Sequence, residues 1–388
     1  SMEGVRVAGV GLTHFGQTPD RTGRELFAEA AEAALADAGV DREAVAELHY
    51  GNFMGALGER QGHQAPLMAE AAGLSCPATR YELACASAGA AVRGAVRAIA
   101  AGQADVVVAG GMERMTNRAI EETTEALAIA ADELFEVRAG VTFPGAYALM
   151  ARSYFEEFGG EREDLAHVAV KNHENAVPNE YAQYRKAITV EQALSAPIIA
   201  EPLGLYDSCP VTDGASALVV VSEAYAEANE LDASVAIVGS GQGGDALALQ
   251  SRGDPARTPA TDAAAMEAFA DAGVGRGDVA AVEVHDCFTI AEVCALEGLG
   301  FYDYGEAVGA ARRGETTADG DLPVNLSGGL KAKGHPVGAT GGSQVVEMTR
   351  LLRGDHPNAD AVDGTVGLTH NAGGTVASAV VHLLEVVE

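Results

Sequence analysis

Two stretches of the chain repeat one order of hydrophobic and polar positions. Residues 34–53 read ALADAGVDREAVAELHYGNF, and residues 268–288 read AFADAGVGRGDVAAVEVHDCF. In each stretch, apolar residues at helical spacing stop at an Asp-Ala-Gly-Val turn, and a short linker leads into alternating apolar residues. Each stretch therefore predicts an amphipathic helix followed by a strand.

Hydrophobic, glycine-closed strands precede both copies, at residues 5–11 (VRVAGVG) and 234–241 (SVAIVGSG). Each copy also leads to a later apolar strand, ADVVVAGG at 104–111 in the first and TVGLTHNAGG at 365–374 in the second. Strands that alternate with helices indicate α/β layers with mostly buried sheets. The shared order favours a duplicated fold over the alternative, a chance similarity between the two halves.

The segment between the copies has a different pattern. Residues 117–196 are rich in charged residues and predict helices and loops, as an insertion laid over one face; the strand at 217–223 then closes the first half. We therefore expect an N-terminal half made of residues 1–116 and 197–230, an inserted loop domain at 117–196, and a C-terminal half at 231–388.

Charge narrows the classes of function. The chain has 56 acidic and 25 basic residues, a formal net charge of −31, and such a surface repels nucleic acid and anionic membranes. No apolar run of about 18 residues is free of charge, so no membrane span is expected. The N-terminus has no basic region followed by a long apolar segment, so a secretory signal is not expected and we predict a cytoplasmic protein.

Lysine and cysteine usage add two expectations. Acidity, an excess of arginine over lysine and many small residues are typical of cytoplasmic proteins of salt-accumulating archaea; a generic acidic protein is the alternative. The five cysteines form no CxxC pair, so neither a metal site nor a disulfide framework is expected, and reduced thiols fit better. The four lysines are Lys171, Lys186, Lys331 and Lys333.

Cys85 is the first candidate for chemistry. It stands between ELA and the small-residue run ASAGAAVRGAVRAI, which places it at a strand-to-helix junction. Unpaired N–H groups and the dipole at a helix start stabilise a thiolate and lower a thiol pKa, so a nucleophile is one interpretation. A small buried core cysteine is the other. The small residues should let this helix pack closely against its counterpart in the other half or against another subunit.

A glycine-rich loop, NLSGGLKAKGHPVGATGGSQ at 325–344, supplies a candidate base. Its glycines permit a backbone that winds close to a ligand, and Pro336 holds His335 in a turn. A histidine there could deprotonate a nearby thiol, or it could be an ordinary loop histidine. Lys331 and Lys333 precede it, and their charges either face phosphate groups or simply solvate the loop.

Two further stretches place polar groups after strands. VEVHDCFTIAEV at 282–293 brings His285, Asp286 and Cys287 to a strand end, where ligands bind in α/β folds. THNAGGT at 369–375 places a glycine pair at another strand end, where free N–H groups could meet an oxyanion. Each of these signals is weak alone.

Taken together, these motifs resemble one family. The order ELACASAG, VTDGAS, HDCFTIAE, SGGLKAKGHPVGATGG and HNAGG is similar to that of thiolases, in the branch with archaeal acetyl-CoA acetyltransferases and sterol-carrier-protein-type thiolases. The resemblance covers essentially the whole chain. It implies a thiolase fold of α/β class, with duplicated halves forming five layers (α-β-α-β-α) and an inserted loop domain.

The resemblance also implies site residues. Cys85 matches the acyl-accepting nucleophile, and His335 matches the base that activates it and then helps to hold the thioester oxygen. His285 stands where many thiolases have the asparagine of an NEAF motif, and would share that oxyanion site. The N–H groups of Cys85 and Gly373 match a second oxyanion site.

One position departs from the family pattern. Ordinary thiolases have a second catalytic cysteine in a C-x-G motif near the C-terminus, and here that position is Asn371. Cys287 of HDCF is the candidate replacement as the base of the carbon–carbon bond-forming step, as is thought for the sterol-carrier branch. Archaeal relatives with alanine there exist, so packing is the alternative. Cys76, Cys209 and Cys294 are expected to be structural.

The resemblance implies an acyltransferase that makes or cleaves 3-oxoacyl-CoA, chiefly acetoacetyl-CoA from two acetyl-CoA, through a cysteine acyl-enzyme. Coenzyme A (CoA) thioesters are then substrates, with Lys331 and Lys333 as tentative CoA contacts, and no metal or organic cofactor is implied. Alternatives are a longer-chain degradative thiolase, a decarboxylating ketoacyl synthase, whose usual HGTGT-like segment is missing, and a non-catalytic acyl-CoA or lipid-binding relative. A homodimer or tetramer is expected. The archaeal branch also suggests a small companion subunit with a zinc ribbon and an OB-fold.

Overall fold

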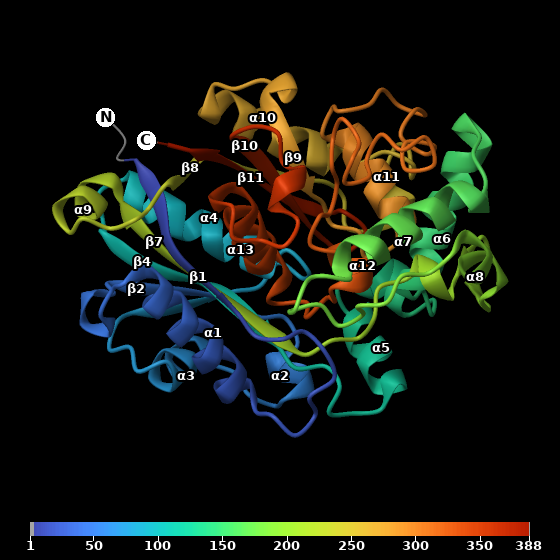
Figure 1. Ribbon diagram of the computed structural model, residues 1–388. Coiled ribbons are helices and arrows are strands. Elements are labelled where there is room, and N and C mark those ends of the chain that lie inside the picture. The colour runs from blue at the N-terminus through green and yellow to red at the C-terminus, as the bar shows by residue number, and fades with distance from the viewer. Residues whose placement is uncertain (1–3, 388) are drawn as a thin grey trace.

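The computed structural model describes residues 4–387, and its core is a set of nine hydrogen-bonded strands (Figure 1). The strand order is β3-β2-β4-β7-β1-β8-β11-β10-β9. β1 and β8 join the two halves through only two residue pairs, Arg6↔Ala236 and Val7↔Val235. The set is therefore two sheets that meet along a short seam. Their strands are β1 (Val5–Leu12), β2 (Glu47–Gly51), β3 (Ala78–Tyr81), β4 (Val106–Glu113) and β7 (Gly214–Ser222) in the first sheet, and β8 (Val235–Gly244), β9 (Val279–Glu283), β10 (Val366–Gly373) and β11 (Ser378–Val386) in the second.

The two sheets repeat one pairing pattern. In the first sheet β2 and β4 are parallel, while β7 is antiparallel to both β4 and β1. In the second sheet β9 and β10 are parallel, while β11 is antiparallel to both β10 and β8. The order β2-β4-β7-β1 thus matches β9-β10-β11-β8. This confirms the duplication that the sequence predicts.

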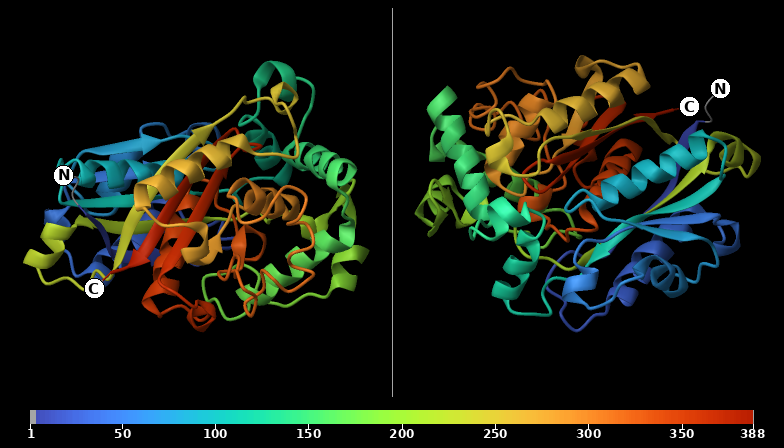
Figure 2. Two further views of the ribbon diagram at one scale, coloured as in Figure 1. Left: turned by 90° about the horizontal axis from the view of Figure 1, so that it is seen from above. Right: turned by 180° about the vertical axis from the view of Figure 1, so that it is seen from behind.

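Helices form three layers around the two sheets. α1 packs on β1 and β7, α4 and α13 lie together between the sheets, and α10 packs on β8 and β11 (Figure 2). The result is the expected α-β-α-β-α arrangement. The helices are α1 (Gly23–Ala38), α2 (Gly55–Gly58), α3 (Gln64–Ala71), α4 (Ser87–Ala100), α5 (Ile120–Ala128), α6 (Phe143–Phe158), α7 (Arg162–Ala176), α8 (Val190–Ser195), α9 (Glu223–Ala228), α10 (Pro259–Ala272), α11 (Thr289–Gly298), α12 (Gly329–Ala332) and α13 (Thr340–Arg353).

Local sequence signals account for the ends of the repeated helices. The Thr22 hydroxyl accepts from the Glu25 amide at the start of α1, which satisfies one free N–H of the first turn. α1 ends at Gly39 (φ +65°) and α10 at Gly273 (φ +69°), left-handed positions that glycine takes without a Cβ penalty. Both are the glycine of the Asp-Ala-Gly-Val turn, as predicted.

The small residues of α4 permit the close approach of its counterpart, α13. A Cβ on Gly341 would lie 2.2 Å from the Gly89 amide nitrogen, and a Cβ on Gly89 would lie 2.5 Å from Oδ1 of Asn371. Gly341 therefore leaves room for the backbone of α4, and Gly89 leaves room for the Asn371 side chain of the second half. The expectation that this helix packs on its counterpart is confirmed.

The segment between the repeats adds α5 to α8 at one end of the layers (Figure 1). α6 and α7 contact α11, α7 also contacts α12 and α8, and α5 contacts α2. Tyr147 and Tyr154 of α6 are fully buried, in the same apolar cluster as Phe288 and Cys287. A short hairpin of β5 (Ile198–Ala200) and β6 (Leu203–Gly204) follows α8. The segment thus contributes core side chains to the second half as well as covering it.

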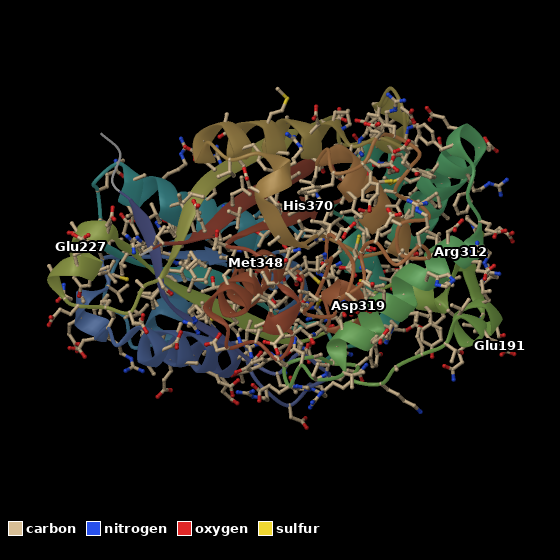
Figure 3. All side chains as sticks on the ribbon, turned by 45° about the horizontal axis from the view of Figure 1, so that its top comes forward. Glu191, Glu227, Arg312, Asp319, Met348 and His370 are labelled. Carbon is tan, nitrogen blue, oxygen red and sulfur yellow. The ribbon has the colours of Figure 1, made fainter. Side chains whose placement is uncertain are left out.

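The surface is acidic and the lysines lie mostly inside. Glu191, Glu227 and Asp319 project outward, whereas His370 and Met348 are interior (Figure 3). Lys171, which pairs with Glu292 at 2.7 Å, is buried, as are the two lysines of the glycine-rich loop. Across residues 4–387, none of the helices combines the length and the apolar character needed to cross a membrane.

Candidate active site

Cys85 lies in the turn between β3 and α4, the predicted strand-to-helix junction. The preceding residue, Ala84, has a φ of +49°, a left-handed conformation that is costly for a residue with a Cβ. The Ala84 amide donates to the Glu82 carboxylate (2.6 Å), and the Ser87 hydroxyl donates to the Ala84 carbonyl (2.5 Å). These bonds hold a sharp turn that presents the thiol toward the second half.

His335 lies in the loop between α12 and α13, and its hydrogen bonds define its tautomer. Its Nδ1 is 2.5 Å from Oγ1 of Thr340. The Thr340 hydroxyl donates its one proton to the Pro336 carbonyl (3.2 Å), so it must accept from Nδ1–H. Nε2 then carries the free lone pair, which is the form that a general base requires.

His285 follows β9, and Asn371 on β10 fixes its tautomer. Oδ1 of Asn371 accepts from the Gly89 amide (3.2 Å), and Nδ2 donates to the Cys85 carbonyl (2.9 Å), which determines how the amide is oriented. The same Nδ2 is 3.1 Å from Nδ1 of His285. Nδ1 therefore accepts, and the proton of the neutral ring is on Nε2. Within residues 4–387 this Nε2 has no hydrogen-bond partner, so its N–H is available to an oxygen that gains negative charge.

The three side chains converge. Sγ of Cys85 and one ring nitrogen each of His285 and His335 lie within 4.8 Å of one another. The two imidazole rings are nearly perpendicular (89°), with centroids 5.0 Å apart. The sequence-predicted nucleophile, base and oxyanion donor thus meet at one place, although they come from three distant parts of the chain.

Three such ligand atoms also raise the question of a metal ion. In the described part of the chain this is the one group of three histidine, cysteine or carboxylate side chains close enough to hold one. A metal ligand needs the lone pair of an imidazole nitrogen, and Nε2 of His285 carries a proton because Asn371 occupies Nδ1. The tautomer therefore suits an oxyanion donor and not a metal ligand.

Burial determines the protonation of the site. It raises the pKa of the Cys85 thiol to about 12, although the amides of Gly374 and Cys85 itself donate to the sulfur and act in the opposite direction. The expected lowering of this pKa by the helix start is therefore wrong, because desolvation of the enclosed sulfur outweighs the N–H groups. Burial also lowers the pKa of His335 to about 3 and that of His285 well below its usual range. The resting site holds a neutral thiol and two neutral imidazoles.

The amide beside the thiol belongs to a neighbour of the predicted residue. Gly374 (φ +62°) donates to the Cys85 sulfur, whereas Gly373 is the last residue of β10 and pairs with Ser378. The assignment of Gly373 to the second oxyanion site stays a prediction, and the neighbouring amide of Gly374 is the one that lowers the pKa of the Cys85 thiol.

Cys287 lies close enough to Cys85 for the two groups to interact electrostatically. It is buried, and a negative charge on Cys209 or Cys85 raises its pKa further above the ordinary range. The Cys209 amide donates to the Cys287 carbonyl (2.9 Å), which ties the main chain at Cys209 to the HDCF segment.

The HDCF segment is tied to the glycine-rich loop by its aspartate. The Asp286 carboxylate accepts from the Leu330 amide (2.7 Å) and from the amide of Asn172 (2.8 Å). This carboxylate connects the segments that carry His285 and His335. The order HDCF…GLKAKGHP therefore positions two histidines through one buried carboxyl group.

Lys331 and Lys333 do not face solvent. Nζ of Lys331 is 3.0 Å from Nε2 of His173, and Nζ of Lys333 binds the Ser343 hydroxyl and pairs with Glu347 at 3.5 Å. Both side chains are 3% exposed. Ammonium groups with internal partners are not available to the phosphates of CoA, so the expectation that these lysines contact CoA is corrected.

Comparison with known proteins places the chain in a family. A model described as "Thiolase, N-terminal domain" matches residues 5–224, and one described as "Thiolase C-terminal domain-like" matches residues 241–386. An acetyl-CoA acetyltransferase of Methanothermobacter thermautotrophicus is 43% identical over 383 residues, 98% of this chain and 99% of that protein. Sterol carrier protein 2 of Bos taurus is 30% identical over 387 residues, 95% of this chain and 70% of that protein. A solved structure described as an Ltp2-ChsH2(DUF35) aldolase has a TM-score of 0.85 at 28% identity, covering 99% of this chain and 98% of that chain.

The chain has a duplicated five-layer α/β core, and a cysteine and two histidines meet between its halves. It is therefore a protein of the class whose thiol site lies at the junction of two related halves. The chain belongs to the thiolase family, as the two family models, which together span most of its length, establish.

Proposed function

We propose that the protein is an acetyl-CoA C-acetyltransferase that makes or cleaves 3-oxoacyl-CoA, chiefly acetoacetyl-CoA from two molecules of acetyl-CoA. The likeness to an archaeal acetyl-CoA acetyltransferase over 98% of the chain supports this activity. The observation that carries it is the convergence of Cys85, His285 and His335 within 4.8 Å. CoA thioesters are substrates in this account, and each step below uses side chains and amides of this chain.

The first half-reaction transfers an acyl group to Cys85. Nε2 of His335 takes the thiol proton as the sulfur attacks the thioester carbonyl. The carbonyl oxygen becomes an oxyanion, and the amides of Cys85 and Gly374, which already donate to the sulfur, are the donors beside it. The carbon–sulfur bond to CoA then breaks, and His335 returns the proton to the departing thiolate. Because thiol and imidazole are both neutral at rest, proton transfer accompanies attack.

The second half-reaction forms the carbon–carbon bond. A base removes a proton from the methyl group of a second acetyl-CoA, and Cys287 as thiolate is our candidate, ending as a thiol. The thioester oxygen takes up the charge as an enolate, for which the unpartnered Nε2–H of His285 is the donor. The enolate carbon attacks the acetyl group, and the Cys85 thiolate leaves. His335, which takes the proton of Cys287 before this step, returns that proton to Cys85. Thiolysis is the same sequence in reverse.

A labelling experiment tests the assignment of the nucleophile. Iodoacetamide should alkylate Cys85 stoichiometrically, and prior incubation with acetyl-CoA should block the reaction by converting the thiol to a thioester. Alkylation that acetyl-CoA leaves unchanged would indicate an acyl-CoA-binding relative without turnover. Initial rates in both directions over a series of acyl-CoA lengths then distinguish an acetyl-specific enzyme from a longer-chain degradative thiolase.

We also propose a small companion subunit of the OB-fold and zinc-ribbon type. A solved relative that aligns with 99% of this chain is described as an Ltp2-ChsH2(DUF35) aldolase. The net charge of −31 repels an anionic substrate, and the two loop lysines are buried. Calorimetric titration of acetyl-CoA into the purified chain, a homodimer or tetramer in our proposal, is the test: micromolar affinity and full turnover without a partner would remove the reason for one.

A salt-adapted cytoplasmic setting is proposed on surface chemistry. Three of the four lysines, Lys171, Lys331 and Lys333, are buried, so the exposed cations are almost all arginines among many carboxylates. Dense surface carboxylates repel one another in dilute buffer and are screened at molar salt. The salt dependence of folding, considered in the Discussion, tests this setting.

A further inference from the structure

Tyr147 brings a hydroxyl from the inserted segment into the thiol cluster. It lies on α6, is 1% exposed, and its ring stacks on that of Phe288 with centroids 4.7 Å apart and planes at 22°. Phe288 directly follows Cys287. The stacking fixes the ring, so the hydroxyl is held at one place next to the HDCF segment.

The Tyr147 hydroxyl has one proton and two acceptors near it. It donates to the Gly374 carbonyl at 2.9 Å, and the Cys287 thiol belongs to the same buried cluster and faces the hydroxyl. A phenol can donate to only one of them at a time. While Cys287 is a thiol, the Gly374 carbonyl accepts the hydrogen bond of the phenol. If Cys287 ionises, its sulfur becomes the stronger acceptor.

The same hydroxyl therefore connects the two halves of the reaction. The amide of Gly374 donates to Cys85, while the carbonyl of Gly374 accepts from Tyr147. A buried thiolate at Cys287 needs a donor, because burial opposes its charge.

We propose that Tyr147 is a positioning residue for the carbon–carbon bond-forming step: its hydroxyl shifts from the Gly374 carbonyl to the Cys287 sulfur when that thiol ionises, and so stabilises the thiolate. This inference rests on the proposed function. No covalent bond of Tyr147 breaks; only its hydrogen bond changes partner. In this proposal Nε2 of His335, neutral again once CoA has left, takes the proton of Cys287 before condensation and returns it to the Cys85 thiolate that condensation releases, while the Cys287 thiolate takes the methyl proton of acetyl-CoA.

The surroundings define what else could titrate here. The groups that face Cys287 and Tyr147 are Cys209, Cys85, Asp286 and Arg252. Arg252 binds the carbonyl and the hydroxyl of Thr375, next to Gly374, and its charge favours ionised or strongly donating forms of the phenol. The oxygens of Asp286 accept from main-chain amides of the glycine-rich loop, and burial raises the pKa of this carboxyl group well above its usual range.

Tyr147→Phe is the direct test, because it removes the hydroxyl and keeps the stacked ring. Tyr154→Phe is the matched control: it lies on the same helix, is 0% exposed, and its hydroxyl binds Glu297 at 2.5 Å, outside the thiol cluster. We expect Tyr147→Phe to form the acetyl-enzyme within about twofold of the wild-type rate and to lose condensation activity about tenfold to a hundredfold, as loss of one hydrogen bond to a charged group implies. Tyr154→Phe should change neither rate.

A readout specific to Cys287 separates this role from a structural one. In a Cys85→Ala background, peptide mass spectrometry measures the rate at which methyl methanethiosulfonate modifies Cys287. This rate should rise with pH, and the midpoint of the rise should lie about one pH unit higher in Tyr147→Phe than with Tyr147 present. Replacing Tyr147 by 3-fluorotyrosine, a stronger donor of nearly the same shape, should move the rise to lower pH, and this variant keeps the test available if Tyr147→Phe does not fold.

Unchanged modification profiles in both Tyr147 variants, or equal losses of acylation and condensation, would overturn the inference. Failure of the wild-type chain to form any acetyl-enzyme would instead overturn the proposed function, so the two failures are distinguishable.

Discussion

The amide nitrogen of Asn371 lies 3.1 Å from Nδ1 of His285 and thereby leaves the proton of that imidazole on Nε2. Most thiolases have a catalytic cysteine at the position of Asn371. Here the side chain contacts Cys85, His285 and Gly89 at once. Asn371 thus orients the His285 ring, and in our proposal the second base is another residue, Cys287.

Asn371→Asp tests this orientation. A carboxylate accepts and cannot donate to Nδ1, so the imidazole proton should move to Nδ1 and the Nε2 donor should be lost. Removal of one oxyanion donor lowers kcat by about a hundredfold to a thousandfold, and we expect a loss of this order in acetoacetyl-CoA synthesis. Asn358→Asp, whose amide binds main-chain carbonyls at Asn175 and Leu326, is the control. Turnover near the wild-type level in Asn371→Asp would refute the tautomer argument.

Cys85→Ala should abolish both acyl transfer and thiolysis while leaving the fold intact, because it removes the covalent acceptor but little volume. Circular dichroism and thermal unfolding check the fold, and coupled assays in both directions check the activity. Retention of more than a few per cent of turnover would show that the nucleophile is a different group.

Cys287→Ala should separate the two half-reactions. Acetylation of Cys85 does not need Cys287, so intact-mass spectrometry should show an adduct of about 42 Da, one acetyl group replacing hydrogen. Condensation should be strongly impaired, and the adduct should accumulate. If condensation runs at the wild-type rate, the base is another group, with His335 and His285 the remaining candidates in the site.

The pH dependence of acetylation follows from the two shifted pKa values. His335, with its pKa lowered to about 3, stays neutral and able to accept a proton until the pH falls toward that value. Cys85, with its pKa raised to about 12, keeps its proton until the pH approaches that value. The single-turnover rate of acetylation should therefore be flat from about pH 5 to about pH 8. A decline centred near about 6.5, the ordinary pKa of histidine, would contradict the burial of this imidazole.

Folding should depend on salt. The chain has 56 acidic and 25 basic residues, so its excess carboxylates repel one another. This repulsion acts over a Debye length of about 30 Å at 0.01 M salt, but only about 3 Å at 1 M. The unfolding midpoint should therefore rise markedly between dilute and molar KCl. A midpoint that does not move would count against a salt-adapted protein.

Much of the fold could be predicted because the chain encodes it twice. The repeated helix, glycine turn and strand gave the element order in both halves, and Gly39 and Gly273 end the two helices at the predicted turns. The junction position of Cys85 followed from the change between strand and helix patterns. These are local signals, so no tertiary contact was needed to interpret them.

The site was less predictable where contacts between distant parts of the chain determine the position or the pKa of a side chain. Tyr147 was missed because an aromatic residue on an amphipathic helix has no local signal of its contact with Gly374, 227 positions away. The pKa of Cys85 was misjudged because burial of the sulfur depends on the second half of the chain. Lys333 was misplaced because its partner, Glu347 of α13, becomes its neighbour only in the folded protein.

The central claim is that Cys85 carries an acetyl group that goes on to form a carbon–carbon bond. Rapid-quench mixing of the purified chain with isotopically labelled acetyl-CoA, followed by peptide mass spectrometry and a chase with unlabelled acetyl-CoA, tests it most directly. We predict label on the Cys85 peptide alone, and its transfer into acetoacetyl-CoA at least as fast as steady-state turnover. Label on another residue, or label on Cys85 that the chase does not convert to acetoacetyl-CoA, would contradict the account.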